Sequence, residues 1–431
     1  MSEGRQPQHK RKIRLSARTG VNTTRIGPDH AEVGGVAPDD DSTTLGAAAA
    51  AAAAPLPAQK KAKMAAPSPP EQKENGGTAG SSSARGRPWT VTVALPGSIV
   101  DNAQTHELRS QLVGQVARAC AIFNVDEIVV FSSSDDGDPA PVNAAASASD
   151  SVADARAKKR TGGSVFMARL LQYLECPQYL RKHIFPLHPD LRGVGLLAPL
   201  DAPHHLRIDE ACEYREGVVV PPGGAYAPRQ GAAVDGGEQE PPAAAQSESS
   251  AVYTGLRKEL KIGRQLPVGT RVTVRMPQAG SANARAATVV PPREPRESAG
   301  LYWGFEVRLA RGLAAVWSEC PHAGGYDLSI GTSEHGSAAL HAPPSASSAP
   351  YALPPFRHLL IVFGGVEGLE PVVAAEEELA DCDGDVAALF DEYLNLCPNQ
   401  GSRTIRTEEA LLVGLSALKP HIEKAGGAQG S

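Results

Sequence analysis

The pattern of apolar and polar positions changes character along the chain, and its first regular part predicts an α/β sheet. Residues 90–94 alternate as in a strand, apolar residues recur at helical spacing over Leu108–Phe123, and Asp126–Ser132 is a short apolar run typical of a buried strand. A helical pattern resumes at Ser164 and is interrupted by Pro177. A strand, a helix and a second strand in this order are typical of α/β proteins.

Between residues 207 and 292 the pattern changes to short β-branched runs with glycine and proline turns, namely "REGVVV", "GLRKELKI", "GTRVTVRM" and "ATVV". Short strands at this spacing predict a small β-barrel. The segment is locally basic through Lys258, Lys261, Arg264, Arg271 and Arg275. Two interpretations of these charges remain open: a nucleic-acid surface, or the solvated outer face of a barrel.

The α/β pattern returns in residues 300–424. Strands are expected in "LYWGFEVRLA", "YDLSIGTSEHG" and "HLLIVFGGVEGLE", and a helix in "VAALFDEYLNLC". A last helix begins near Thr407, a candidate N-cap followed by two glutamates, and is expected to stop at Pro420. The α/β domain is therefore expected to be split into residues 88–206 and 300–424, with the barrel inserted between them.

Low-complexity stretches interrupt the regular pattern. The tail at residues 1–87 and the acidic, proline-rich loop at 221–250 are expected to be disordered. Residues 135–161 and the Pro/Ser/Ala-rich residues 337–355 are interpreted as low-complexity insertions. The tail carries the basic runs "HKRKIR" and "KKAK". These runs are interpreted either as nuclear-import signals or phosphate contacts, or as charges on a solvated tail. The first interpretation predicts a nuclear protein.

Net charge, cysteine spacing and the length of apolar runs exclude or disfavour several classes of protein. The chain of 431 residues has a net charge of −6, which argues against a histone-like coat of positive charge. Its six cysteines form no CxxC pair, a pattern that favours reduced intracellular thiols over a disulfide framework or a zinc site. No apolar run approaches the ~18 residues of a membrane span. We therefore expect an intracellular protein with neither a membrane partner nor a bound metal.

Three loops share one character, because each follows an apolar segment and presents small or polar residues. The first loop is Gly331–Gly336, the second loop is Phe363–Gly368 and the third loop is Asn395–Thr407. In an open α/β sheet, ligands bind beyond the carboxyl ends of the strands, and glycine allows the backbone to approach a ligand closely. The three loops are therefore the candidate binding site, although "GGVEG" is also compatible with a simple turn.

Several common catalytic signatures are absent from the sequence, namely GxGxxG with a following acidic residue, the Walker phosphate loop, GxSxG and HExxH. The missing dinucleotide fingerprint disfavours a nicotinamide-dependent oxidoreductase. His204 and His205 are adjacent, which suits neither two metal ligands on one helix face nor a catalytic triad. A pair that is hydrogen-bonded or faces solvent is expected instead.

The motifs "YDLSIGTSEHG", "FRHLLIVFGGVEGLE" and "NLCPNQGSRTIRTEEALLVGLSAL" resemble those of SPOUT-type RNA methyltransferases. The resemblance is to the eukaryotic and archaeal branch with an inserted OB-like barrel, and it covers about residues 88–420 outside the insertions. It implies a trefoil knot, an exception to the usual absence of knots, with S-adenosylmethionine bent within the knot loops. It also implies an RNA substrate and a homodimer. A catalytically inactive RNA-binding or scaffold protein with the same fold is the alternative.

The resemblance also assigns roles within the three loops. Arg403 is a candidate catalytic residue that would bind a carboxylate or a target phosphate, and Glu367 is a candidate base. The alternatives are an ion pair of Arg403 or Arg406 with Glu408 or Glu409, and a Glu367 that is merely exposed. The cofactor would be held by Thr332, Ser333, His335 (where relatives more often carry arginine), Gly364, Gly365, Gly368, Asn395, Leu396, Gly401, Ile405, Arg406 and Thr407.

Overall fold

The computed structural model describes residues 86–132, 162–221, 249–277, 286–342, 350–382 and 384–428. The low-complexity stretches at 1–87, 135–161 and 221–250 lie outside these ranges, apart from a few residues at their edges, as do residues 343–349 of the insertion at 337–355. The same is true of the two basic runs in the tail. The expectations for these stretches therefore stay predictions.

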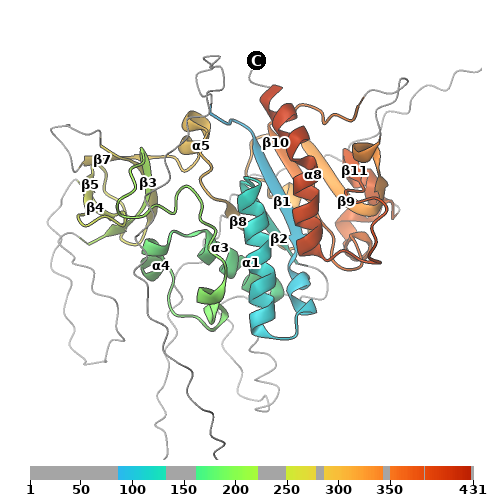
Figure 1. The fold of residues 1–431 in the computed structure, drawn as a ribbon, viewed down its shortest axis with the longest axis horizontal. Coiled ribbons are helices and arrows are strands. Elements are labelled where there is room, and N and C mark those ends of the chain that lie inside the picture. The colour runs from blue at the N-terminus through green and yellow to red at the C-terminus, as the bar shows by residue number, and fades with distance from the viewer. Residues whose placement is uncertain are drawn as a thin grey trace, which may run out of the picture. The chain divides into compact units, whose positions relative to one another are not determined.

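Six parallel strands form the sheet of the α/β part (Figure 1). Their order is β11-β9-β10-β1-β2-β8, so that β1 pairs with β10 on one side and with β2 on the other. Because every pair is parallel, the carboxyl ends of all six strands lie at the same edge. The strands are β1 (Thr90–Pro96), β2 (Glu127–Phe131), β8 (Glu306–Ala310), β9 (Leu328–Ser337), β10 (His358–Val362) and β11 (Glu392–Leu394).

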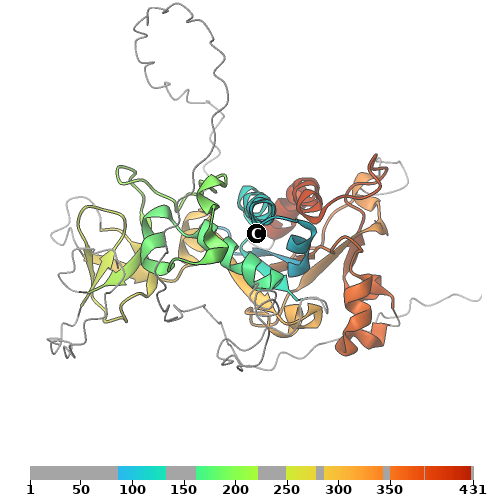
Figure 2. The ribbon, with the colours of Figure 1, turned by 90° about the horizontal axis from the view of Figure 1, so that it is seen from below.

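Apolar layers cover both faces of this sheet. On one face α1, α3 and α8 pack through a core that includes Leu112, Phe166 and Leu415, and α1 lies beside α8 (Figures 1 and 2). On the other face α6, α7 and short 3-10 helices pack through Leu313 and Val373. The helices are α1 (His106–Ile122), α3 (Gly163–Glu175), α4 (Gln178–Ile184), α5 (Glu294–Ala299), α6 (Leu313–Ser318), α7 (Glu370–Ala375) and α8 (Thr407–Gly427). Short 3-10 turns are η1 (Gly97–Asn102), η3 (Pro189–Leu191), η4 (Val194–Leu196), η5 (Ala339–His341), η6 (Glu377–Cys382) and η7 (Val386–Leu389).

The predicted small barrel is present as a closed barrel of five strands in the order β3-β4-β5-β7-β6. Its interior is filled by Val219, Val252, Ile262 and Val274, which come from four different strands. In the chain, the barrel strands lie between β2 and β8, which pair with each other in the sheet. The strands are β3 (Tyr214–Val220), β4 (Ser250–Tyr253), β5 (Leu260–Ile262), β6 (Arg271–Arg275) and β7 (Ala286–Val290).

Two expected elements differ from the structure. The run "VAALFDEYLNLC" was expected to be a helix but forms η7 followed by β11, because Tyr393 and its neighbours pair with β9 at the sheet edge. The expected strand in "LYWGFEVRLA" covers only its second half, since β8 begins at Glu306. Its first half includes Gly304 with φ +83°, a conformation that a regular strand does not allow.

The expected end of the last helix at Pro420 is also wrong, because α8 continues to Gly427 with Pro420 inside it. Proline cannot donate the hydrogen bond of that turn. However, the following turn buries Ile422 and Gly426, and a Cβ on Gly426 would lie only 2.6 Å from the Trp89 ring. Close packing on the sheet core therefore offsets the missing bond.

Searched over the described ranges, the chain has no helix with the length and hydropathy of a membrane span.

Candidate functional site

The three loops predicted from the sequence meet at the carboxyl edge of the sheet and are linked by hydrogen bonds. The Thr332 hydroxyl of the first loop donates to the carbonyl of Val362, which directly precedes the second loop, at 3.0 Å. The Thr407 hydroxyl of the third loop donates to the Gly364 carbonyl of the second loop at 3.0 Å. The Asn395 amide of the third loop donates to the Glu334 carbonyl of the first loop at 2.8 Å. Residues 30 to 61 positions apart in the chain thus form one constellation.

The first loop is a bulge within a strand rather than a loop after one. β9 runs to Ser337, but consecutive residues Tyr393 and Leu394 of β11 pair with Gly331 and Ser337. Residues 332–336 are therefore extruded from the ladder. Within the bulge, the Ser333 hydroxyl accepts a hydrogen bond from the His335 amide at 3.2 Å, and the His335 side chain is 76% exposed.

The second loop is a tight turn closed by two reciprocal hydrogen bonds. Gly365 and Gly368 exchange N–H···O bonds of 3.2 Å, and Gly368 has a φ of +83°. A Cβ on Gly364 would lie 2.6 Å from the backbone of Gly368, so this position requires glycine. A Cβ on Gly365 would meet only Pro96 Cγ at 3.7 Å, so open space lies beside this residue.

The third loop leads into α8, and its structure corrects the expected cap. The N-cap is Arg406 rather than Thr407, and the Glu409 side chain accepts from the Arg406 amide at 3.0 Å. The Arg406 guanidinium pairs with the Glu408 carboxylate at 2.8 Å, the alternative weighed for this arginine. Thr407 is thereby free to bond the second loop, and its side chain is buried.

The other assigned residues differ in exposure. Arg403, Glu367 and Gly401 are exposed, whereas Leu396 is buried. Both ends of the Asn395 amide are engaged, because its Oδ1 accepts from the Cys397 amide at 3.0 Å. Ile405 is half-buried beside Arg406. The interior of the constellation is thus held by hydrogen bonds, and Arg403 and Glu367 are among the exposed charged groups at its rim.

Sequence reasoning missed two residues of this constellation. Pro96 lies at the carboxyl end of β1 and faces Gly365. His341 contributes its Nε2, which lies 3.0 Å from the Leu396 carbonyl. Pro96 could have been found, because the rule that ligands lie beyond strand ends applies to β1 as well. The sequence carries no comparable signal for His341.

Tyr393, which pairs with Gly331 at the start of the first loop, has a neutral hydroxyl. Burial raises the pKa of Tyr393, which lies near Ser333 and Glu370, so its hydroxyl stays protonated at neutral pH. A hollow of about 740 Å³ lies between the third loop and α8, and it is lined by Leu396 and Cys397 of the loop and by Leu412 and Val413 of the helix, among others. Over the described residues, no group of three or more His, Cys, Asp or Glu side chains is arranged to hold a metal ion.

The histidine pair lies away from this constellation. His204 and His205 both place Nε2 near the Glu175 carbonyl, at 2.9 and 2.7 Å. His204 is completely buried. The expectation of a hydrogen-bonded pair is confirmed for Nε2 of both rings, whereas the buried Nδ1 of His204 has no hydrogen-bond partner among the described residues.

Replacing the hydroxyl that links the second and third loops should destabilise the protein. Thr407→Val keeps the shape of the side chain but leaves the Gly364 carbonyl without this donor, and we expect a loss of about 1–3 kcal/mol in the free energy of unfolding. Urea denaturation followed by circular dichroism measures it. Thr404→Val, which alters an exposed hydroxyl in the same loop, should change stability by less than about 0.5 kcal/mol. Equal effects of the two variants would contradict the assigned link.

Comparison with known proteins identifies a family and several relatives of this chain. The family described as "Putative RNA methyltransferase" matches residues 90–418, a range that includes the sheet, the barrel and all three loops. A mouse protein named 28S rRNA (uridine-N(3))-methyltransferase is 48% identical over 352 residues, which are 80% of this chain and 80% of the relative. The human protein of the same name is 48% identical over 81% of this chain and 82% of its own length. A Drosophila melanogaster relative of that name is 41% identical over 78% of this chain and 63% of its own length. The chain belongs to this family of RNA methyltransferases.

Proposed function

We propose that this protein transfers a methyl group from S-adenosylmethionine to N3 of a uridine in the RNA of the large ribosomal subunit. The observation that carries the proposal is the convergence of the three loops, within a chain 48% identical to relatives named for that reaction. The alternative of an inactive scaffold has no structural observation in its favour.

The three loops fit a nucleoside-like cofactor. Gly365 leaves open space where a side chain would stand, and the Gly365–Gly368 turn presents backbone groups at its edge. Ile405 is half-buried and offers apolar surface for an adenine ring, whereas Leu396 is buried and lines the hollow beside α8. S-adenosylmethionine supplies an electrophilic methyl group on a sulfonium.

The chain must then align the base and remove a proton. N3 of uridine carries a hydrogen between two carbonyls, so its lone pair becomes available only when that proton leaves. In this proposal Glu367 accepts the proton, and the Arg403 guanidinium stabilises the negative charge that spreads onto the uracil oxygens. Both side chains are exposed at the rim, where a base flipped out of its stack can reach them.

The proposal is tested with the full-length protein, S-adenosylmethionine and unmodified large-subunit ribosomal RNA. Nuclease digestion and mass spectrometry should detect 3-methyluridine that depends on both protein and cofactor. RNA binding without methyl transfer would favour the scaffold alternative. Methylation of a different base or of ribose would reject the assigned atom.

The barrel offers a basic segment for RNA. Arg257, Lys258, Lys261 and Arg264 are exposed and follow one another around β5. The two other basic residues expected to face nucleic acid are engaged elsewhere, since Arg271 and Arg275 pair with glutamates. We therefore include only residues 257–264 in the RNA surface, where they would bind phosphates.

We further propose that the three loops form the trefoil knot of the SPOUT fold and that the protein is a nuclear homodimer. The hollow between the third loop and α8 supports the dimer. Leu412 and Val413 of α8 line this hollow, and these two residues are 46% and 39% exposed. Exposed apolar surface of this kind is typical of protein interfaces.

Adding charge to this hollow should dissociate the dimer. We expect Leu412→Glu combined with Val413→Glu to convert dimers to monomers in sedimentation velocity at micromolar concentration, because a buried carboxylate without a partner is costly. Lys424→Glu changes charge on the same helix outside the residues lining the hollow, and it should leave the dimer intact. A dimer that survives the double substitution would place the interface elsewhere.

A further inference from the structure

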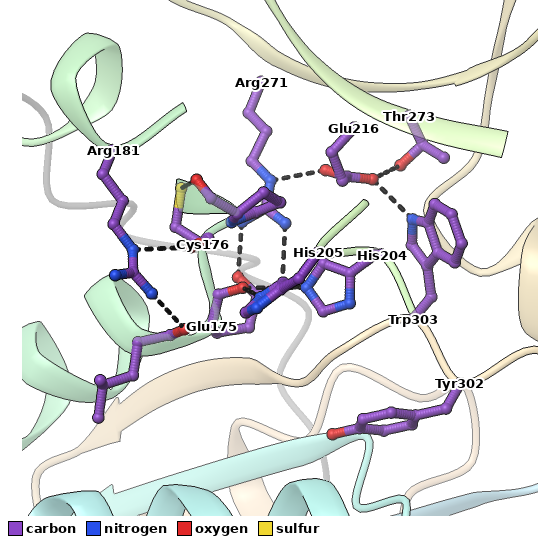
Figure 3. A network of polar contacts seen from close by, with 12 residues as sticks. Glu175, Cys176, Arg181, His204, His205, Glu216, Arg271, Thr273, Tyr302 and Trp303 are labelled. Carbon is purple, nitrogen blue, oxygen red and sulfur yellow. Dashed lines mark hydrogen bonds and ion pairs between the residues drawn. The ribbon is translucent and has the colours of Figure 1, made fainter. Parts of the chain in front are cut away.

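A buried polar cluster joins the barrel to the α/β part of the chain (Figure 3). Its centre is Arg271 of β6, whose side chain is 24% exposed and whose guanidinium lies between two buried carboxylates. Both terminal nitrogens of Arg271 donate to Glu175, the last residue of α3, at 2.6 and 2.9 Å. Its Nε donates to Glu216 of β3 at 2.6 Å. One cation therefore connects the barrel to a helix of the sheet layer.

All four carboxylate oxygens in the cluster have donors. Besides Arg271, Glu175 Oε1 lies 3.0 Å from His204 Nε2. Glu216 Oε1 accepts from Thr273 Oγ1 at 2.5 Å and from Trp303 Nε1 at 2.7 Å. Both glutamates are less than 10% exposed. Burial alone would raise the pKa of Glu175, but the Arg271 charge and His204 hold it well below its ordinary value.

Residues around this cluster pack closely against it. Gly304 has a φ of +83°, and a Cβ there would lie 2.4 Å from Glu175 Oε1. The Tyr179 hydroxyl of α4 donates to the Glu216 carbonyl at 3.0 Å. A small apolar cluster beside it packs Cys176 and Leu180 against Val218 of the barrel.

Ion pairs of this kind contribute orientation more than they contribute stability. Two carboxylates and an arginine lose much solvation on burial, so an apolar contact of similar size often stabilises a protein as well. The guanidinium, however, is a rigid planar fork that bonds in fixed directions. A lysine could satisfy one carboxylate but not hold both in these positions.

We propose that Arg271 is a positioning residue that fixes the orientation of the barrel on the α/β part and thereby sets where the barrel presents RNA to the three loops. Only the claim about RNA placement rests on the proposed function; the claim about barrel orientation does not. The basic segment 257–264 lies two strands away from Arg271 in the same closed barrel. The cluster contains none of the residues assigned to the cofactor, so cofactor affinity does not depend on it.

The first test measures barrel orientation directly and needs neither RNA nor cofactor. Spin labels are attached to cysteines placed at Gln115 of α1 and Thr288 of β7, both exposed, after Cys212, Cys320 and Cys397 are changed to serine. Double electron–electron resonance should give one narrow distance distribution. Glu175→Gln combined with Arg271→Met removes the ion pair between the helix and the barrel while Glu216 keeps its donors Thr273 and Trp303, and it should at least double the width of the distribution.

Two further variants keep this test decisive. Arg271→Lys retains the cation and is therefore expected to fold, and it should broaden the distribution to an intermediate width. Arg275→Met removes an arginine from the same strand that is 46% exposed, and the distribution should stay narrow. Unchanged widths in both Arg271 variants would overturn the proposal.

The second test separates positioning from general damage. In unlabelled protein, the Arg271 variants should raise the KM for RNA about tenfold, with kcat and the Kd for S-adenosylmethionine within twofold of the unsubstituted protein. A broadened distribution with an unchanged KM would reject the link to RNA placement, and a parallel loss of cofactor binding would show a merely structural role. Absence of methyl transfer in the unsubstituted chain would instead reject the proposed function, while the distance measurement stands.

Discussion

Gly365→Val is expected to abolish S-adenosylmethionine binding without unfolding the protein. The Cβ of the new side chain would meet only Pro96 Cγ at 3.7 Å, an ordinary contact, and Gly365 does not have a positive φ. The valine methyl groups would instead occupy the open space assigned to the cofactor. We expect the Kd in isothermal titration calorimetry to rise by roughly 100-fold or more, which corresponds to about 2.7 kcal/mol.

Two other glycines provide matched controls for this prediction. Gly364→Val should lower the melting temperature together with cofactor affinity, because its Cβ would lie 2.6 Å from the Gly368 backbone. Gly263→Val in the barrel has no atom within 4 Å of its Cβ and should change neither. If Gly365→Val binds the cofactor normally while remaining folded, the pocket lies elsewhere.

Arg403→Met is expected to remove most methyl transfer while sparing cofactor binding. Arg403 is exposed in the third loop, and the described residues offer it no ion-pair partner, in contrast to Arg406. Loss of a donor to charge that develops during the reaction typically lowers kcat by about 10²–10³-fold. Single-turnover rates with saturating RNA measure this effect, and calorimetry measures cofactor affinity.

The outcome distinguishes the roles considered for this arginine. Arg357→Met alters another exposed arginine, which directly precedes β10 at the opposite edge of the sheet, and it should leave the rate unchanged. A loss of cofactor affinity equal to the loss of rate would assign Arg403 to the carboxylate of the cofactor. An unchanged rate would remove Arg403 from the reaction.

Much of the fold could be predicted because short-range patterns determine it. Alternating and buried runs identified β1, β2 and β10, helical spacing identified α1 and α3, and β-branched runs identified the barrel. The errors have long-range causes. Residues 392–394 form β11 because they pair with β9, a strand more than 50 residues away in the chain. Helix α8 continues beyond Pro420 because its last turn packs against Trp89, which is also distant in the sequence.

The candidate site was predictable as a set of loops but not as a set of contacts. Glycine and hydroxyl residues after apolar strands identified the three segments, and their meeting at one edge follows from parallel pairing. Which partner each side chain takes depends on tertiary geometry. Two sets of hydrogen bonds illustrate this limit. The Thr407 hydroxyl bonds to Gly364 rather than capping its own helix, and the Asn395 side chain bonds to the backbone of Glu334 and Cys397.

The position of β1 has a consequence for the order of assembly during synthesis. Thr92 of β1 meets Glu127 of β2 across 35 residues, whereas Thr90 meets His358 of β10 across 268. The barrel closes within a much shorter span, since Tyr214 meets Arg275 across 61 residues. Contacts that are distant in sequence form slowly. During synthesis the chain can therefore complete its barrel before β10 is made, while the edge of β1 that pairs with β10 is still unpaired. Chaperone protection of that unpaired strand edge matters most at this stage.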